Sequence, residues 1–283
     1  MVDAPYGLKS TLREGSQKTT LRYLTYVRYD KNDENHIFEP TPISSKEKTM
    51  SNQETIYNKR MKVADLLAND GNLLSILQRL DIKLGFGEAT VAELCARYNI
   101  SAELFLIICN IYSFGDYRPE VETLDKNDIR SITTYLRASH RYYTSICFPN
   151  IHASIHKLVD SLDNVSRRLI DKFYDDYDNE VTNHFRYEEE VVFPYIEELF
   201  AKDGCKESPY SIGQFEHNHS NINEKLNDLK NIITKYLNEE YSSPLCFELL
   251  NDIYSVEKDL CKHSLIENRL LIPLVEKMER SNG

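Results

Sequence analysis

Two short stretches of this chain decide its fold: His184-Phe-Arg-Tyr-Glu188 and His263-Ser-Leu-Ile-Glu267. Each places a glutamate four residues after a histidine. On a helix, side chains at this spacing lie on one face, so the pair can direct a nitrogen and an oxygen at the same volume. A single histidine lies 44 residues before each motif, at His140 and His219. The equal intervals predict a repeated structure that brings the four histidines to one level.

The residues halfway along each interval are typical of turns. Leu162-Asp-Asn164 lies midway between the first two histidines, and Tyr241-Ser-Ser-Pro244 lies midway between the last two. Ala201-Lys-Asp-Gly204 separates the two halves. Each interval therefore predicts a helix, a turn and a returning helix. We expect an all-α protein whose main part is an up-down-up-down four-helix bundle, with helices at residues 124–161, 164–201, 211–239 and 243–281.

These histidines and glutamates are the residue types that bind transition metals. Four imidazoles and two carboxylates are too many ligands for one tetrahedral zinc ion and fit two metal ions, with the glutamates free to bridge them. A solvated or hydrogen-bonded side chain explains any one of these histidines alone, but not the repeated set. The predicted metal ligands are His140, His184, Glu188, His219, His263 and Glu267.

The stretches His184 to Pro194 and His263 to Pro273, with Ser139-His140 and His219-Ser220, resemble hemerythrin-like di-iron proteins. The resemblance is to the family called RIC, for repair of iron centres, which includes YtfE and ScdA, and it covers residues 125–280. It implies two iron ions in a non-haem, oxo- or hydroxo-bridged centre held by the six ligands. Glu180, one turn before His184, matches an acidic position near the metals of that family.

The resemblance also implies a function. Members of the family restore iron–sulfur clusters damaged by oxidative or nitrosative stress, so damaged iron–sulfur proteins are the expected partners and oxygen or nitric oxide the expected small ligands. Iron donation and nitric oxide reduction are both compatible with six protein ligands, since two six-coordinate metals then keep open positions. The alternative is a binding module that senses or scavenges oxygen or nitric oxide. Enzymatic turnover and an oligomeric state are left open at this point.

The chain before residue 116 divides into two segments. Residues 1–49 are polar and lack a helical stripe, so we expect a disordered tail, with Met50 as a second candidate for the native start. Residues 50–115 carry apolar residues at helical spacing and predict a small helical domain similar to the N-terminal domain of ScdA, followed by the bundle at 116–283. Leu84-Gly-Phe-Gly87 stands where that family has a Cys-Cys pair, so thiol chemistry is not expected there.

Composition narrows the partners further. The net charge is −11 and its acidic excess lies in the bundle, which disfavours nucleic acid and anionic membranes. A helix-turn-helix between Thr90 and Ile111 would lack a basic recognition stripe. The sequence has no apolar run of about 18 residues, so we expect no membrane span. The six cysteines have no paired C-x-x-C spacing, so we expect reduced thiols and a cytoplasmic location.

Two further sequence features bear on the helices. His152 and His156 lie four residues apart and are rotated by more than about 100° from His140, so they should face solvent. A solvated pair is favoured over a surface zinc site. Pro149, Pro194 and Pro273 lie near the level of the predicted metals and predict kinks or helix restarts, because proline cannot donate a backbone hydrogen bond.

Overall fold

The computed structural model describes residues 56–201, 209–218, 222–241 and 243–280. Their regular secondary structure is helical throughout, which confirms the predicted all-α class. The described residues belong to one compact unit, Gln53–Gly283. The predicted tail at residues 1–49 lies outside the described residues.

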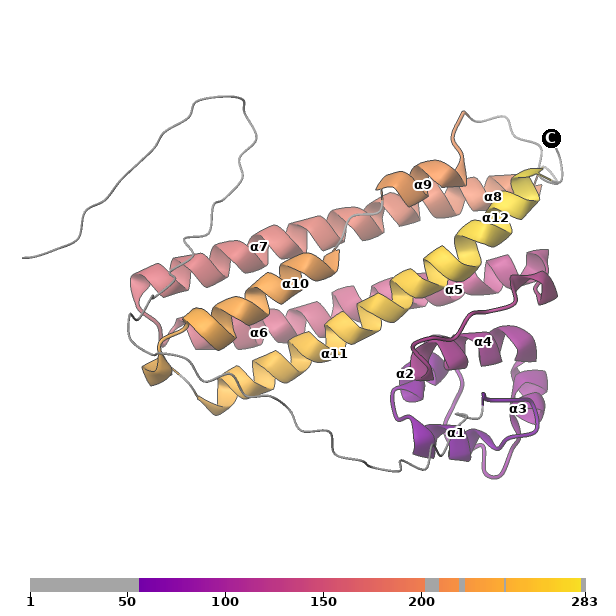
Figure 1. Cartoon of the computed structure of the whole chain (residues 1–283), viewed down its shortest axis with the longest axis horizontal. Coiled ribbons are helices and arrows are strands. Elements are labelled where there is room, and N and C mark those ends of the chain that lie inside the picture. The colour runs from indigo at the N-terminus through magenta and orange to yellow at the C-terminus, as the bar shows by residue number, and fades with distance from the viewer. Residues whose placement is uncertain (1–55, 202–208, 219–221, 242, 281–283) are drawn as a thin grey trace, which may run out of the picture. The chain divides into compact units, whose positions relative to one another are not determined.

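Four helical segments form the bundle (Figure 1). The first consists of α5 (Lys126–Tyr142), η2 (Tyr143–Cys147) and α6 (Phe148–Val159). The second consists of α7 (Asn164–Tyr187), η3 (Glu188–Val192) and α8 (Phe193–Ala201). The third contains α9 (Ile212–Asn218), α10 (Ile222–Asn231), η4 (Ile232–Tyr236) and a short 3-10 turn, η5 (Glu239–Tyr241). The fourth consists of α11 (Pro244–Ile266), η6 (Glu267–Leu271) and α12 (Ile272–Arg280). These ranges agree with the four predicted helices.

Three of the segments contain a π-helical turn just before a proline. The turns η2, η3 and η6 begin six residues before Pro149, Pro194 and Pro273. Proline has no N–H, and its ring clashes with the carbonyl four residues earlier in an α-helix, so a local change of hydrogen-bond register accommodates it. The helices therefore continue through the prolines by π turns. Glu188 and Glu267 are the first residues of two of these turns.

Four shorter helices precede the bundle, joined to it through a 3-10 turn, η1 (Val121–Thr123). They are α1 (Val63–Asn69), α2 (Leu73–Arg79), α3 (Val91–Tyr98) and α4 (Ala102–Ser113). A capping box of Thr90 and Glu93 starts α3, and the Ser101 side chain caps α4. Every residue of α4 from Leu104 to Tyr112 is buried, because this helix is apolar on all sides and must be covered on all sides.

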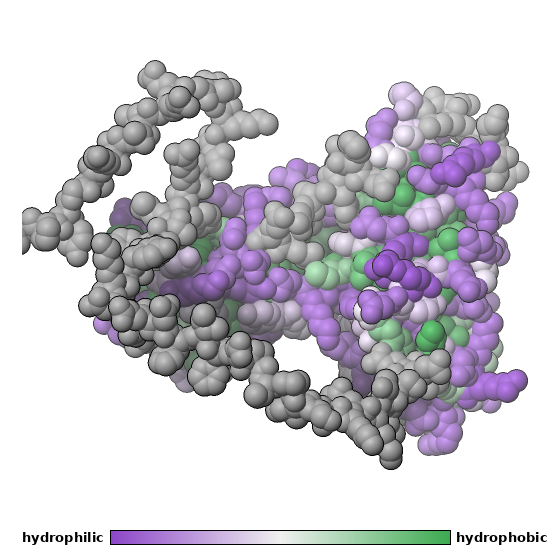
Figure 2. Space-filling model, in the orientation of Figure 1, coloured by the Kyte–Doolittle hydropathy of each residue, from purple (hydrophilic) through white to green (hydrophobic). Residues whose placement is uncertain are grey.

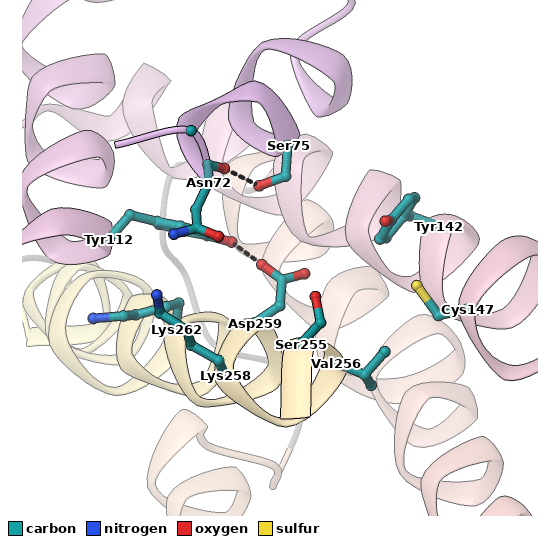
Figure 3. Close-up of a pocket in the computed structure, with 11 residues that line it drawn as sticks. Asn72, Ser75, Tyr112, Tyr142, Cys147, Ser255, Val256, Lys258, Asp259 and Lys262 are labelled. Carbon is teal, nitrogen blue, oxygen red and sulfur yellow. Dashed lines mark hydrogen bonds between the residues drawn. The ribbon is translucent and has the colours of Figure 1, made fainter. Parts of the chain in front are cut away.

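A buried polar network joins α2 and α4 to the fourth segment of the bundle. Arg79 of α2 forms an ion pair with Asp259 of α11, and its side chain is only 2% exposed. Tyr112 of α4 donates its hydroxyl hydrogen to Asp259 Oδ1 at 2.8 Å (Figure 3). Lys262 of α11 donates to the Ile111 carbonyl at 2.8 Å. The short helices therefore pack on the helix that carries one of the HxxxE motifs.

The hydrophobic core forms two clusters. One contains residues of α1 to α4 together with the start of α5 and residues of α8, α9 and α12. The other fills the opposite half of the bundle, between α6, α7, α10 and α11. The first cluster contains residues from both sides of the predicted boundary at residue 115. The division into a small domain at 50–115 and a bundle at 116–283 remains a prediction.

In the face shown in Figure 2, hydrophilic side chains dominate and hydrophobic residues lie between them. Among the described helices, none combines the length and the apolar character needed to cross a membrane.

Candidate metal centre

The candidate metal centre lies where the two hydrophobic clusters meet. In α5, His140 stands between Leu136 of one cluster and Tyr143 of the other. Glu188 and His263 occupy corresponding positions in the second and fourth segments of the bundle. A polar layer thus interrupts an otherwise apolar core, and buried polar groups of this kind need partners. The bundle geometry brings candidate ligands from three segments to one level.

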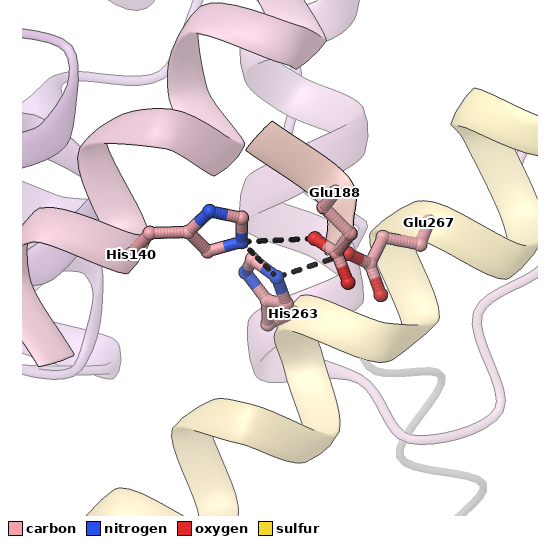
Figure 4. Close-up of side chains that lie close together, drawn as sticks. All are labelled: His140, Glu188, His263 and Glu267. Atoms are coloured by element: carbon pink, nitrogen blue, oxygen red, sulfur yellow. Dashed lines mark hydrogen bonds and ion pairs between the residues drawn. The ribbon is translucent and has the colours of Figure 1, made fainter. Parts of the chain in front are cut away.

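Four buried side chains converge in this layer. His140, Glu188, His263 and Glu267 each offer one ligand atom, and these atoms all lie within 4.8 Å of one another. Figure 4 shows the two imidazoles and the two carboxylates directed at a common volume. Both glutamates are 0% exposed. Among the described residues this is the one group of three or more His, Cys, Asp or Glu residues that meets this spacing.

Glu188 connects imidazoles from two different helical segments. Its Oε2 lies 3.0 Å from His140 Nε2, and its Oε1 lies 2.6 Å from His184 Nε2. On the other side, His263 Nε2 lies 3.0 Å from Glu267 Oε1 and 3.3 Å from His140 Nε2. Within each HxxxE motif, the histidine and the glutamate therefore contact each other through their side-chain tips, as expected for residues four apart on one helix face.

The structure places five of the six predicted ligands around this volume. His140, Glu188, His263 and Glu267 form the cluster, and His184 joins it through its contact with Glu188. His219 lies outside the described residues. Glu180 is half-buried on α7, and its carboxylate forms an ion pair with Lys225 of α10.

The electrostatics of this layer favour a cation. Burial by itself would lower the pKa of His140, but hydrogen bonds to Glu188 and Glu189 outweigh it and raise that pKa to about 9. The pocket thus favours a positive charge next to its two fully buried carboxylates. A bound metal cation would offset the repulsion between the carboxylates in the same way. The residues present therefore fit a metal.

An orienting pair, which the sequence reasoning missed, holds His140. Its Nδ1 lies 2.9 Å from Glu189 Oε1, and Arg137 Nε lies 3.2 Å from Glu189 Oε2. A carboxylate on the distal nitrogen fixes the ring and its tautomer, so that Nε2 faces the cluster. The sequence signal that could have identified this pair is an acidic residue next to Glu188 and an arginine one turn before His140.

Aromatic rings enclose the imidazoles. Phe185 stacks on His140 with ring centroids 4.3 Å apart, and Phe193 stacks at 5.7 Å. Tyr143 approaches His263 edge-on at 5.7 Å. These rings restrict the histidine rotamers and exclude water from the polar layer, which strengthens the electrostatic interactions inside it.

Comparison with known proteins agrees with this geometry. Residues 131–275 match the family model described as Hemerythrin HHE cation binding domain, and this range covers more than half of the chain. Comparisons with curated proteins and with solved structures give no significant match. The matched range begins in α5, ends in α12 and contains all four clustered residues. The chain therefore belongs to the hemerythrin HHE cation-binding family.

Proposed function

We propose that the cation site is a non-haem di-iron centre and that the chain belongs to the RIC branch of hemerythrin-like proteins. Its role would be the repair of iron–sulfur clusters damaged by oxidative or nitrosative stress. The observation that carries the proposal is the position of Glu188, whose two oxygens face His140 and His184 on different helical segments. A carboxylate placed in this way is suited to bridge two metal ions, one on each oxygen.

The proposed ligands are the six residues of the repeated motif. Two imidazoles and two carboxylates form the described cluster, and His184 extends it by one imidazole. His219, which matches His140 in the repeated sequence spacing and lies outside the described residues, would complete the set. Six protein ligands do not saturate two six-coordinate metals, so the site would keep positions for small molecules. When bound, the pair of irons would supply one-electron redox chemistry and coordination of oxygen or nitric oxide.

The chain's own residues would control iron release. His184 has an 8% exposed side chain, whereas the side chains of the four clustered residues are at most 5% exposed. The side of the centre near His184 is therefore the most open among the described ligands. Phe185 and Phe193 cover His140 by stacking on its ring, and Phe185 also lies against the His184 ring, with centroids 5.8 Å apart.

Metal loading tests the centre itself. Glu188→Gln keeps the shape of the side chain but removes the charge and one metal-binding oxygen. We expect the iron content after anaerobic reconstitution to fall from two per chain to one or none. Glu190→Gln is the matched control, because Glu190 is exposed and lies on the same π turn. Two irons per chain in Glu188→Gln would contradict the bridging role.

Repair activity tests the function. A [4Fe–4S] enzyme inactivated by nitric oxide should regain activity with the iron-loaded protein, but not with Glu188→Gln or with an equal amount of free Fe²⁺. Measuring nitrous oxide in the same reaction separates nitric oxide reduction from iron donation. Stoichiometric binding of nitric oxide, with no nitrous oxide and no recovered enzyme, would instead support a sensor or scavenger.

A further inference from the structure

A second group of metal-ligating side chains lies on the surface of α6, apart from the buried centre. His152 and His156 are both exposed, and their Nε2 atoms face each other at 2.8 Å. The ring centroids are 4.1 Å apart and the rings are nearly perpendicular, at 86°. We propose that this pair is a separate, exchangeable site for a divalent transition metal ion of the zinc, copper or nickel class.

The geometry is close to that of a two-histidine chelate. Zinc–nitrogen bonds are about 2.0–2.1 Å long, so two nitrogens on one tetrahedral ion lie about 3.3 Å apart. The rings therefore need to separate by only about half an ångström, which a small side-chain rotation provides. Without a metal, one Nε2 must carry a proton to donate to the other. With a metal, both can be neutral lone-pair donors to the same ion.

His152 is held in place before any metal arrives. Its ring stacks on Tyr174 of α7, with centroids 5.5 Å apart and planes 29° apart. Tyr174 is itself buried, and its hydroxyl donates to the Phe148 carbonyl at 3.0 Å. One of the two ligands thus sits on a fixed platform, which reduces the conformational entropy lost on binding. His156 lies one turn further along the same face.

The donor set makes this site chemically different from the buried centre. In the described part of the chain, no further His, Cys, Asp or Glu joins the pair at ligand distance. Water would therefore fill the remaining positions, and the site would exchange its metal readily. Sites made only of imidazole and water follow the order in which Cu²⁺, Ni²⁺ and Zn²⁺ bind more tightly than Fe²⁺ or Mn²⁺. Asp175 and Asp178, near Tyr174 on α7, add negative charge that attracts cations.

The test titrates Zn²⁺ into the full-length chain whose buried centre has already been filled with metal. We expect one additional zinc per chain, with His156→Ala weakening its binding about a hundredfold, because chelation multiplies the affinity of a single donor by about 10²–10⁴. The matched control is the double variant His156→Ala with Lys157→His. It keeps the number of histidines but places the second one about 140° away from His152 around the helix.

Copper gives a second readout. Electron paramagnetic resonance of one equivalent of Cu²⁺ should show coupling to two nitrogens in the wild-type chain and to one in His156→Ala. All these positions are exposed, so circular dichroism and the metal content of the buried centre should stay unchanged in each variant. The proposal is overturned if no additional zinc binds, if His156→Ala binds it as tightly as the wild type, or if the displaced histidine restores the affinity. The comparison holds whatever metal the buried centre contains, so its outcome is independent of the di-iron proposal.

Discussion

Removing Asp259 should destabilise the protein strongly, because it leaves a buried arginine without its counter-ion. The Arg79 side chain is 2% exposed and that of Asp259 is 17% exposed. Arg79 Nη1 donates to Asp259 Oδ1 at 3.2 Å and to the Tyr112 hydroxyl at 2.6 Å. Breaking one side of a buried ion pair costs about 3–5 kcal/mol, since the remaining charge is neither solvated nor paired. We expect this loss for Asp259→Ala.

The pair as a whole should contribute much less than this loss suggests. Replacing both members with apolar residues of similar volume is often neutral or stabilising, because two desolvation penalties disappear together. The double variant Arg79→Met with Asp259→Leu should therefore recover most of the lost stability. It still leaves the Tyr112 hydroxyl without its acceptor, at about 1–3 kcal/mol. A double-mutant cycle with the single variants Arg79→Met and Asp259→Leu then measures the coupling between Arg79 and Asp259.

The assay is thermal and urea unfolding of the metal-free chain. At roughly 2–4 °C per kcal/mol for a protein of this size, Asp259→Ala should lower the Tm by roughly 6–20 °C. Glu88→Ala is the matched control, because it breaks the exposed Lys62–Glu88 pair and should change stability by less than about 1 kcal/mol. If Asp259→Ala has no larger effect than Glu88→Ala, α2 is not packed against α11 in solution and the reasoning fails.

The same pair predicts a dependence on pH. Burial would raise the pKa of Asp259, but the hydrogen bonds and charge of Arg79 outweigh it and hold that pKa below its usual value. Because the folded-state pKa is lowered, ionised Asp259 contributes its full stabilisation above the unfolded-state pKa of about 3.9. This stabilisation is lost as the pH falls through the folded-state pKa. The stability difference between wild type and Asp259→Ala should therefore shrink in acid. A constant difference down to pH 2 would contradict the ion pair.

Three further predictions concern the centre and the core. Glu189→Ala should weaken metal affinity about 10–100-fold by freeing the His140 ring, as measured by competition with a chelator; unchanged affinity would exclude the orienting role. In the metal-free protein, the folded-state pKa of His140 is raised to about 9. Protonated His140 therefore contributes its full stabilisation below about pH 6.5, and this stabilisation is lost as the pH rises through 9. Urea unfolding should show this loss in the wild type and not in His140→Ala. Leu249→Ala, at a fully buried position, should cost about 2–5 kcal/mol in the same assay without changing metal content.

The sequence by itself determined the bundle and predicted which residues would form the candidate site. Four predicted helices agree with the observed segments, because the period of apolar residues and the turn residues between them are local signals. The HxxxE spacing placed Glu188 and Glu267 on the same faces as their histidines, since that relation depends only on helix geometry. The equal 44-residue intervals predicted that His140 and His263 lie at the same height along the bundle, where their rings meet.

Tertiary structure alone decided the contacts between segments. Nothing local to Glu189 shows that its carboxylate reaches His140 across the bundle, and nothing local to Arg79 shows that Asp259, 180 residues away, neutralises it. The predicted kinks at the prolines became π turns, because packing on both sides favours a continuous helix with a changed register. A local pattern gives the face of each helix, whereas the partner of a buried charge depends on which faces pack together, and that is a property of the whole fold.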